Sequence, residues 1–320
     1  MSSVAAIIPN WNTAAHLERC LTSLGAQRGV SIDTMVVDNG SKDASMELIK
    51  RLGVHHVALA SNIGFAAAVN LGADKTSAPL VLVLNADCFL APDCLRLLVA
   101  EMTADHRLGG VQPRILQDAP ATHVARIYST GQYLTRRGAT FERGWGEPDG
   151  PRHAARGEVF GVSGAACLLR RELFTDLGGY DAAYFAFFED VDLNARARLA
   201  GWRFAYVPDA VAIHVGHVAW RQEQQAQRFL VELIVRNRLA TAVKVLPARG
   251  VIGSAALTLR SIAGGPRHGT SAAVLAGTLS ALRWLPRLLR ERRRLRSESP
   301  HLLDDWLART AGPGPNPDDI

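Results

Sequence analysis

The stretch Leu80-Val81-Leu82-Val83-Leu84-Asn85-Ala86-Asp87 decides the fold, because five apolar residues pass directly into a short polar end. A short apolar run bounded by polar residues is typical of a strand buried on both faces of a parallel sheet. Ligands of open parallel sheets bind at the carboxyl ends of the strands. Asp87 therefore stands where such a strand would present a carboxylate to a ligand.

The first hundred residues repeat this arrangement, with short apolar runs alternating with amphipathic stretches. The alternation predicts βα units that build an α/β domain, Rossmann-like, around a mostly parallel central sheet flanked by helices. Helices are expected to begin near Thr13, Asp43 and Phe65. The earlier strands are expected at Val4–Ile8, Thr34–Val37 and Val57–Leu59.

The rest of the 320-residue chain differs in character from this first part. Between about residues 117 and 157 the periodicity fails, and Gly, Pro and Arg dominate. We expect an irregular segment there and assign it no chemistry. The four cysteines form no CxxC pair, so neither a zinc site nor a disulfide framework is expected, and the thiols should be reduced and buried. They are Cys20, Cys88, Cys94 and Cys167.

After Arg221 the sequence reads as long helical segments that end in a basic run. Seven arginines lie between Arg283 and Arg296 against one acid, Glu291, and this excess accounts for the formal charge of +6. Leucines interleave with them, which is typical of a helix lying on an anionic membrane surface. A solvated basic helix packed on the rest of the protein is the alternative. No recognised nucleic-acid-binding motif is present, so no nucleic-acid partner is expected.

No apolar segment reaches the roughly 18–20 residues of a transmembrane helix. The N-terminus lacks the basic and apolar regions of a signal peptide, because Pro9 ends the first apolar run early. We therefore expect the protein in the cytoplasm, either free or peripheral on the inner face of the cell membrane.

Polar side chains follow four successive predicted strands. One Asp or Asn after a strand is usually a turn residue, but four such ends favour a shared ligand. The phosphate-binding patterns GxGxxG and GxxxxGK[ST] are both absent, so a hard cation such as Mg²⁺ or Mn²⁺ is expected to bind the ligand's phosphates. The four ends carry Asn10 with Asn12, Asp38 with Asn39, Asn62 with Gly64, and Asn85 with Asp87.

A second cluster of acids lies in Phe187-Phe188-Glu189-Asp190-Val191-Asp192. One interpretation is that these acids do no more than cap a helix and complement its dipole. They could also supply a carboxylate that takes a proton from an attacking hydroxyl, with the aromatic neighbours raising its basicity. His214 and His217 follow a strand expected at Ala210–Ile213, and either structural or metal-ligand roles are open to them.

Taken in order, several short motifs over about residues 4–220 resemble the family 2 glycosyltransferases. Each is weak alone, and their order and spacing carry the resemblance. It implies a catalytic domain with the GT-A fold. The motifs are Ile8-Pro9-Asn10-Trp11-Asn12, Val37-Asp38-Asn39-Gly40-Ser41-Lys42-Asp43, Asn62-Ile63-Gly64-Phe65-Ala66, Leu84-Asn85-Ala86-Asp87, Gly178-Gly179-Tyr180-Asp181 and Phe188-Glu189-Asp190-Val191-Asp192-Leu193.

The resemblance also implies roles for single residues. Asp190 matches the catalytic base, with Glu189 as second choice, and His214 matches a histidine that joins the metal shell. Asn85-Ala86-Asp87 stands where the family has a DxD-type motif, and Asn85 in its first position leaves most of the metal binding to Asp87. Asp38 matches an acid that reads the edge of uracil or thymine. The remaining donor-binding positions are Pro9, Asn10, Asn12, Asn39, Asn62, Gly64, Phe65, Asn70, Asn85 and Ala86.

These matches imply an inverting, metal-dependent glycosyltransferase over residues 1–220, followed by a helical basic extension over residues 221–320. It would move a sugar from a dTDP- or UDP-sugar to a hydroxyl of a glycan or lipid-linked acceptor in cell-surface polysaccharide or glycolipid synthesis. Residues 117–157 would then be mobile or lie on the acceptor side. The forms Asn62-Ile63-Gly64-Phe65-Ala66 and Phe187–Leu193 resemble the rhamnosyltransferase branch.

Two alternatives from other classes stay open. A sugar nucleotidyltransferase should carry a glycine-rich loop with a nearby Arg or Lys after its first strand, where this chain has Asn10-Trp11-Asn12. A catalytically inactive glycan- or nucleotide-binding scaffold would not need Asp38, Asp87 and Asp190 together.

Overall fold

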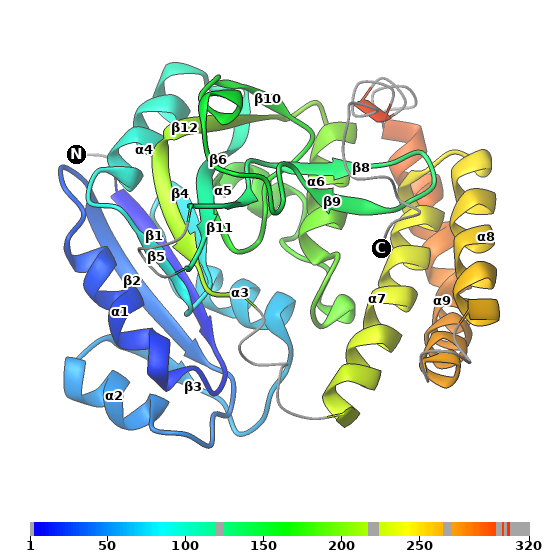
Figure 1. The fold of residues 1–320 in the computed structure, drawn as a ribbon, viewed down its shortest axis with the longest axis horizontal. Helices are drawn as coiled ribbons and strands as arrows, with labels where there is room; N and C mark the ends of the chain where they lie inside the picture. Colours follow the sequence, from blue (N-terminus) through cyan, green and yellow to red (C-terminus); the bar gives the residue numbers. More distant parts are fainter. Residues whose placement is uncertain are drawn as a thin grey trace.

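The computed structural model describes residues 3–119, 124–216, 224–264, 270–298, 303, 306 and 307. His217, one of the two predicted histidines, lies outside this part. In the described part a large sheet is covered by helices on both faces, and a group of long C-terminal helices packs along one side (Figure 1).

The large sheet has ten strands, of which eight follow the order β10-β12-β6-β11-β4-β1-β2-β3, while β5 pairs with β12 and β7 with β6. The half that contains β4, β1, β2 and β3 is parallel, and β11 joins it antiparallel. The strands are β1 Ser3–Asn10, β2 Ser31–Asp38, β3 His55–Ala58, β4 Leu80–Leu84, β5 Cys88–Leu90, β6 Leu108–Gln117, β7 Ile127–Ser129, β10 Gly157–Val159, β11 Ala166–Arg170 and β12 Arg203–His214.

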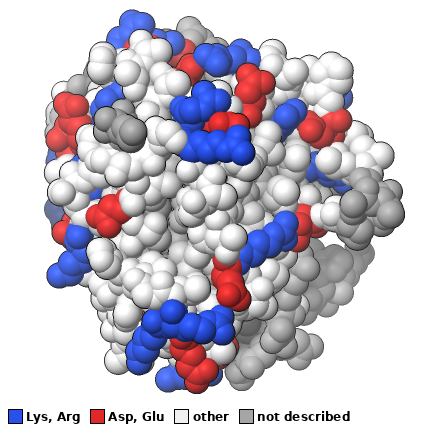
Figure 2. Space-filling view, turned by 90° about the vertical axis from the view of Figure 1, so that its left-hand side faces the viewer, with Lys and Arg blue, Asp and Glu red and all other residues white. Residues whose placement is uncertain are grey.

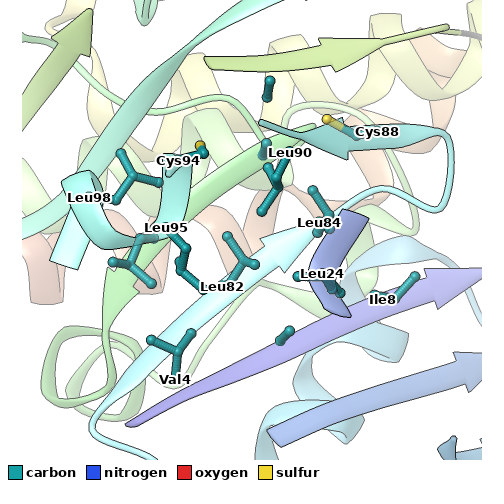
Figure 3. Packing of buried hydrophobic residues seen from close by; sticks show 14 of the residues in the cluster. Val4, Ile8, Leu24, Leu82, Leu84, Cys88, Leu90, Cys94, Leu95 and Leu98 are labelled. Carbon is teal, nitrogen blue, oxygen red and sulfur yellow. The ribbon is translucent and has the colours of Figure 1, made fainter. Parts of the chain in front are cut away.

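Alternating side chains of the central strands build two cores. Ile8 and Leu82 point to one face, where they pack with Leu95 and Leu98, as Figure 3 shows. Ile7 points to the other face. Because successive strand residues face opposite sides of a sheet, an unbroken apolar run such as Leu80–Leu84 fills both cores. The four cysteines are free and buried, as expected.

The first three helices begin near the expected positions, and their apolar faces cover the sheet. A further helix begins within the second cluster of acids, at Glu189. The helices are α1 Ala14–Gly25, α2 Ser45–Leu52, α3 Phe65–Asp74, α4 Cys94–Ala104, α5 Arg171–Asp176, α6 Glu189–Leu199, α7 Gln224–Val245, α8 Ala248–Gly264 and α9 Ser271–Glu298, with single 3₁₀ turns at Pro151–His153 and Ala182–Tyr184.

The segment from 117 to 157 contains more regular structure than expected. It supplies β7 and a separate two-stranded sheet made of β8 (Gln132–Leu134) and β9 (Thr140–Glu142). These strands have three residues each and pair locally, so they leave no periodic pattern long enough to detect in the sequence.

The C-terminal helices share a core with the part of the chain before them. Phe188 and Val191, at the start of α6, belong to the same buried cluster as Leu246, which follows α7, and Leu288 of α9. The basic run is therefore not a free helix: Leu288 and Leu295 are buried, and Arg292 donates hydrogen bonds of 2.6 Å to the carbonyls of Val243 and Leu246. None of the described helices is both long enough and apolar enough to cross a membrane.

Candidate functional site

A cavity of about 890 Å³ lies at the carboxyl ends of the parallel strands. Asn10, Asn39, Asp87, His214 and Asp190 all line it. Of the predicted site residues, those that line it are Pro9, Asn10, Asn39, Asn62, Phe65, Asn85, Ala86, Asp87, Glu189, Asp190 and His214.

The first two strand ends are joined by buried hydrogen bonds. Asn10 donates from Nδ2 to Asp38 Oδ1 over 2.8 Å, and Thr13 Oγ1 donates to Asn10 Oδ1 over 2.5 Å. The other oxygen of Asp38 accepts from the backbone N–H of Ser41. Asp38 is only 2% exposed and does not line the cavity. In this structure it orients Asn10 and the loop at Ser41.

The loop at Asn62–Gly64 is held by Asn39, which follows β2. Asn39 accepts a hydrogen bond from the N–H of Ile63 and donates one to the carbonyl of Gly64, while the N–H of Gly64 donates to Asn62 Oδ1. Gly64 has a φ of +93°, and a Cβ there would lie 2.6 Å from the carbonyl oxygen of Phe185. Gly64 thus lets this loop contact the loop before α6 and does not itself line the cavity.

Two predicted donor-binding residues take other roles in the structure. Asn70 donates to the carbonyl of Tyr180 and accepts from its N–H, so both ends of its amide fix the turn at Tyr180. Asn12 accepts from the N–H of Lys42 over 2.7 Å and has a φ of 53°. Neither residue lines the cavity. Their amides satisfy backbone groups, which a motif match cannot distinguish from ligand binding.

Asp87 and His214 meet across the sheet because β12 pairs with β5, placing His214 opposite Cys88. His214 Nε2 lies 3.1 Å from Asp87 Oδ1, and the N–H of Gly216 donates to Asp87 Oδ2 over 3.1 Å. Burial opposes ionisation of Asp87, but the hydrogen bond and charge of His214 outweigh it and lower the pKa of the carboxyl. An ionised carboxylate beside an imidazole results.

These two side chains fit a divalent cation. No group of three or more His, Cys, Asp or Glu that could hold a metal occurs among the described residues. Magnesium commonly uses one or two carboxylates, with substrate phosphates and waters completing its shell, so two protein ligands are sufficient. The rings of Tyr128 and His214 pack edge to face with their centroids 4.4 Å apart, and this contact fixes the orientation of the imidazole. His214 Nδ1 is buried without a hydrogen-bond partner in the described part.

The loop before α6 is strained. Phe185, Phe187 and Phe188 have φ values of 65°, 66° and 69°, a region that bulky side chains rarely adopt. Asn237 of α7 stabilises this loop, because its Nδ2 donates to the carbonyls of Tyr184, Ala186 and Phe187. The C-terminal helices therefore help to shape the cavity wall.

Asp190 lies in the first turn of α6 and lines the cavity. Its Oδ2 accepts from the N–H of Gly164 over 2.9 Å and from Gln132 Nε2 over 2.7 Å, and its Oδ1 accepts from the N–H of Val191. Burial raises its pKa despite these hydrogen bonds. Glu189 is 6% exposed, and burial together with the charge of Asp190 raises its pKa well above the usual range.

Asp192, the third acid of the cluster, faces away from this chemistry. It is fully buried and pairs with Arg196 over 2.7 Å and with Lys244 over 2.7 Å. No side-chain hydrogen bond caps α6, but all three acids lie in its first turn, where they complement the helix dipole.

Two polar residues near Asp190 were missed by the sequence analysis. Gln132 and Glu142 come from β8 and β9 and line the cavity. The amide nitrogen of Gln132 contacts both carboxylates, at 2.7 Å from Asp190 Oδ2 and 3.1 Å from Glu142 Oε1. Burial and the charge of Asp190 raise the pKa of Glu142 to about 7. A single Gln or Glu in an irregular stretch carries no signal that could have identified them.

Comparison with known proteins agrees with this geometry. Residues 5–178 match the model of glycosyl transferase family 2. The chain is 29% identical over 229 residues to an N-acetylglucosaminyl-diphospho-decaprenol L-rhamnosyltransferase of Mycobacterium tuberculosis, which covers 64% of this chain and 73% of that protein. It is also 44% identical to rhamnosyltransferase WbbL of Escherichia coli over 55 residues, 17% of this chain and 21% of that one.

Solved structures share the fold. The mannosyltransferase PcManGT from Pyrobaculum calidifontis, solved with GDP-Man and Mn²⁺, superposes with a TM-score of 0.56 at 18% identity over 96% of this chain and 84% of that one. GalNAc-T7, solved with UDP, GalNAc and Mn²⁺, gives 0.62 at 15% identity over 94% and 58%. These neighbours are GT-A glycosyltransferases, so the expected fold is confirmed. The chain is a glycosyltransferase and belongs to glycosyl transferase family 2.

Proposed function

We propose that this glycosyltransferase moves a sugar from a dTDP- or UDP-sugar to an acceptor hydroxyl with inversion, and that it needs Mg²⁺ or Mn²⁺. One observation carries the proposal: the Asp87–His214 pair and the half-buried carboxylate of Asp190 line the same cavity. A site for donor phosphates and a proton acceptor are the two parts that a single displacement at the anomeric carbon requires.

Asp87 and His214 would hold the cation together. The lowered pKa of Asp87 favours its carboxylate form, and His214 Nε2 lies 3.1 Å from Asp87 Oδ1. A cation there would stabilise the negative charge of the departing nucleoside diphosphate. Asn10, Asn39 and Asn62 would line the nucleotide end of the cavity. Asp38 would act through Asn10, which it orients.

Asp190 would accept the proton of the attacking hydroxyl. Gly164, Gln132 and Val191 orient its two oxygens, and its raised pKa makes it a stronger base than an exposed aspartate. Glu189 is less suited, because burial and the neighbouring charge of Asp190 raise its pKa and so favour the protonated form, which cannot accept a proton.

The relatives guide the choice of substrates. The Mycobacterium tuberculosis relative is named for transfer of L-rhamnose to N-acetylglucosaminyl-diphospho-decaprenol, and it aligns with 64% of this chain. We therefore propose a dTDP-rhamnose-type donor and a lipid-linked sugar diphosphate as acceptor, within cell-surface polysaccharide synthesis.

A lipid-linked acceptor requires access to a membrane surface. Leu275, Leu279, Leu282 and Leu289 are exposed along one side of α9, next to exposed arginines such as Arg290. Exposed leucines beside arginines favour an anionic bilayer surface. By contrast, basic and acidic side chains are interspersed over the left-hand side of the molecule (Figure 2). We propose that α9 docks the protein peripherally on the inner membrane face.

The role of Asp190 is tested with Asp190→Asn, which keeps the shape of the side chain but cannot take up the proton. Turnover should fall about 10²- to 10⁴-fold, whereas donor affinity should stay unchanged. Asp176→Asn, an exposed position on α5, is the control and should behave like the wild type. Near-normal turnover of Asp190→Asn would remove Asp190 from the base role.

A further inference from the structure

Arg238 of α7 differs from the other partly or fully buried arginines near the site. It lines the cavity, and in the described part its only hydrogen bond runs from Nη2 to Thr258 Oγ1 over 2.7 Å. Its Nε is buried without a partner, and no described carboxylate pairs with it. Arg196 and Arg236, in contrast, are satisfied by a carboxylate or by backbone carbonyls.

A half-buried guanidinium without a counter-charge is costly, because burial removes part of its hydration and the one hydrogen bond to Thr258 replaces only some of it. Burial lowers the pKa of Arg238 for this reason. An anion bound in the cavity would supply the missing charge. Guanidinium groups match phosphate geometry well, since their donors are arranged in a planar fork.

The neighbouring helix adds a second cation to this wall. Arg260 and Ser261 of α8 line the same cavity, and Thr258, which accepts from Arg238, lies one half-turn before Arg260. The wall formed by Arg238, Arg260 and Ser261 is called here the helical wall. It belongs to α7 and α8, which lie to the right of β4 and β12 in Figure 1. The proposed donor-phosphate site is built from other elements, β12 and Asp87, which follows β4, and both sets of residues line the one cavity.

The same helix has an exposed apolar face. Ile252 and Leu259 of α8 are 70% and 67% exposed. They are seven residues apart, so they share one face of the helix, and this face lies roughly opposite Leu257, Arg260 and Ser261, which line the cavity. A helix with cationic side chains toward the cavity and an apolar outer face suits a phosphate ligand that is joined to a lipid chain and presented at a membrane surface.

We propose that the helical wall is the acceptor-phosphate site: Arg238 and Arg260 bind the diphosphate of a lipid-linked sugar acceptor. This rests on the proposed function. The arrangement would place the acceptor sugar between the helical wall and Asp190, with its hydroxyl toward the donor.

Two acceptors that differ only in the diphosphate test this. One is N-acetylglucosamine joined through a diphosphate to a short polyprenol, and the other is the glycoside of the same sugar and polyprenol. The wild type should prefer the diphosphate acceptor in kcat/KM. Arg238→Ala should lower that preference about 10- to 100-fold, the usual effect of losing hydrogen bonds to a charged group. Arg238→Lys should lower it less.

Arg228→Ala removes an exposed charge from the same helix and should keep the wild-type preference. A wild type that uses both acceptors equally would overturn the proposal without any variant having to fold. An equal loss on both acceptors in Arg238→Ala would also overturn it, since that indicates a structural role. Absence of transfer to either acceptor, from any nucleotide sugar, would instead contradict the proposed function itself.

Discussion

Glu142 shows how burial sets the chemistry of a single side chain. One of its oxygens accepts hydrogen bonds from Gln132 and Ser163, and the other is buried without a partner in the described part. Burial and the nearby charge of Asp190 raise its pKa from 4.5 to about 7. The folded protein thus binds this proton more tightly than the unfolded chain does. The resulting stability is fully present below about pH 4.5 and is lost as the pH rises through about 7.

Glu142→Gln should remove this pH dependence, because the amide stays neutral and its oxygen can keep both hydrogen bonds. The free energy of unfolding of the variant minus that of the wild type should be larger at pH 8 than at pH 5. The increase should be at most about 3 kcal/mol. Thermal unfolding of both proteins at the two pH values measures this. Glu172→Gln, at an exposed position, is the control. The same difference in stability at both pH values would contradict the account.

Among single residues, the sequence predicted those site residues that lie directly at the end of a strand or the start of a helix. Asn10, Asp87 and Asp190 stand in short motifs next to regular elements, and all three line the cavity. Asp38 and Asn70 matched equally well but bind other protein groups, since a motif does not state which way a side chain points. The roles of all these residues in catalysis stay predictions.

At the scale of elements, α6 and α7 are joined by a buried ionic cluster. Lys244 of α7 is 2% exposed and lies 2.7 Å from Asp192 of α6, 3.1 Å from Asp181 and 3.0 Å from Glu291 of α9. Burial would lower the pKa of Lys244, but these carboxylates raise it. The cluster ties the helix that carries Asp190 to the C-terminal helices.

Lys244→Met should therefore destabilise the protein by about 1–3 kcal/mol, because it removes one of the two cations that pair with the fully buried Asp192. Chemical denaturation measures the free energy of unfolding. Lys50→Met, at an exposed position on α2, should change it by about 0.5 kcal/mol or less. A similarly small effect of Lys244→Met would show that the cluster does not couple these helices.

The helices and strands were predictable where the pattern of apolar and polar residues was clear. Leu80–Leu84 is a strand with the expected bounds, since its apolar run is unbroken and its ends are polar. The strands β8 and β9 were missed, because strands of three residues are too short to leave a periodic pattern in the sequence. The contact of α7 with the strained loop before α6 depends on Asn237, which the sequence gave no reason to single out.

At the scale of the whole molecule, the basic excess is concentrated on one helix. Part of α9 packs inward through Leu288, Leu295 and Arg292, as the alternative interpretation of the basic run expected. Its exposed side still carries leucines and arginines. Residues 1–220 and the helices after them share a buried cluster, and we propose that they fold as one unit.

Membrane docking is tested by sedimentation with vesicles at low salt. The protein should pellet with anionic vesicles and not with neutral ones, and the bound fraction should fall as salt is added. Arg290→Glu combined with Arg293→Glu should abolish pelleting, whereas Arg51→Glu on α2 should not. Failure of the wild type to pellet with anionic vesicles would contradict the docking proposal.

The central claim is that one cavity combines metal-dependent donor binding with sugar transfer. The most direct measurement is release of nucleoside diphosphate by the purified protein from a panel of nucleotide sugars, with Mn²⁺, Mg²⁺ or EDTA. The account predicts release of dTDP or UDP from one donor, supported by a divalent cation and abolished by EDTA. Release that is unaffected by EDTA would contradict the metal role of Asp87 and His214, and no release from any donor would favour an inactive scaffold.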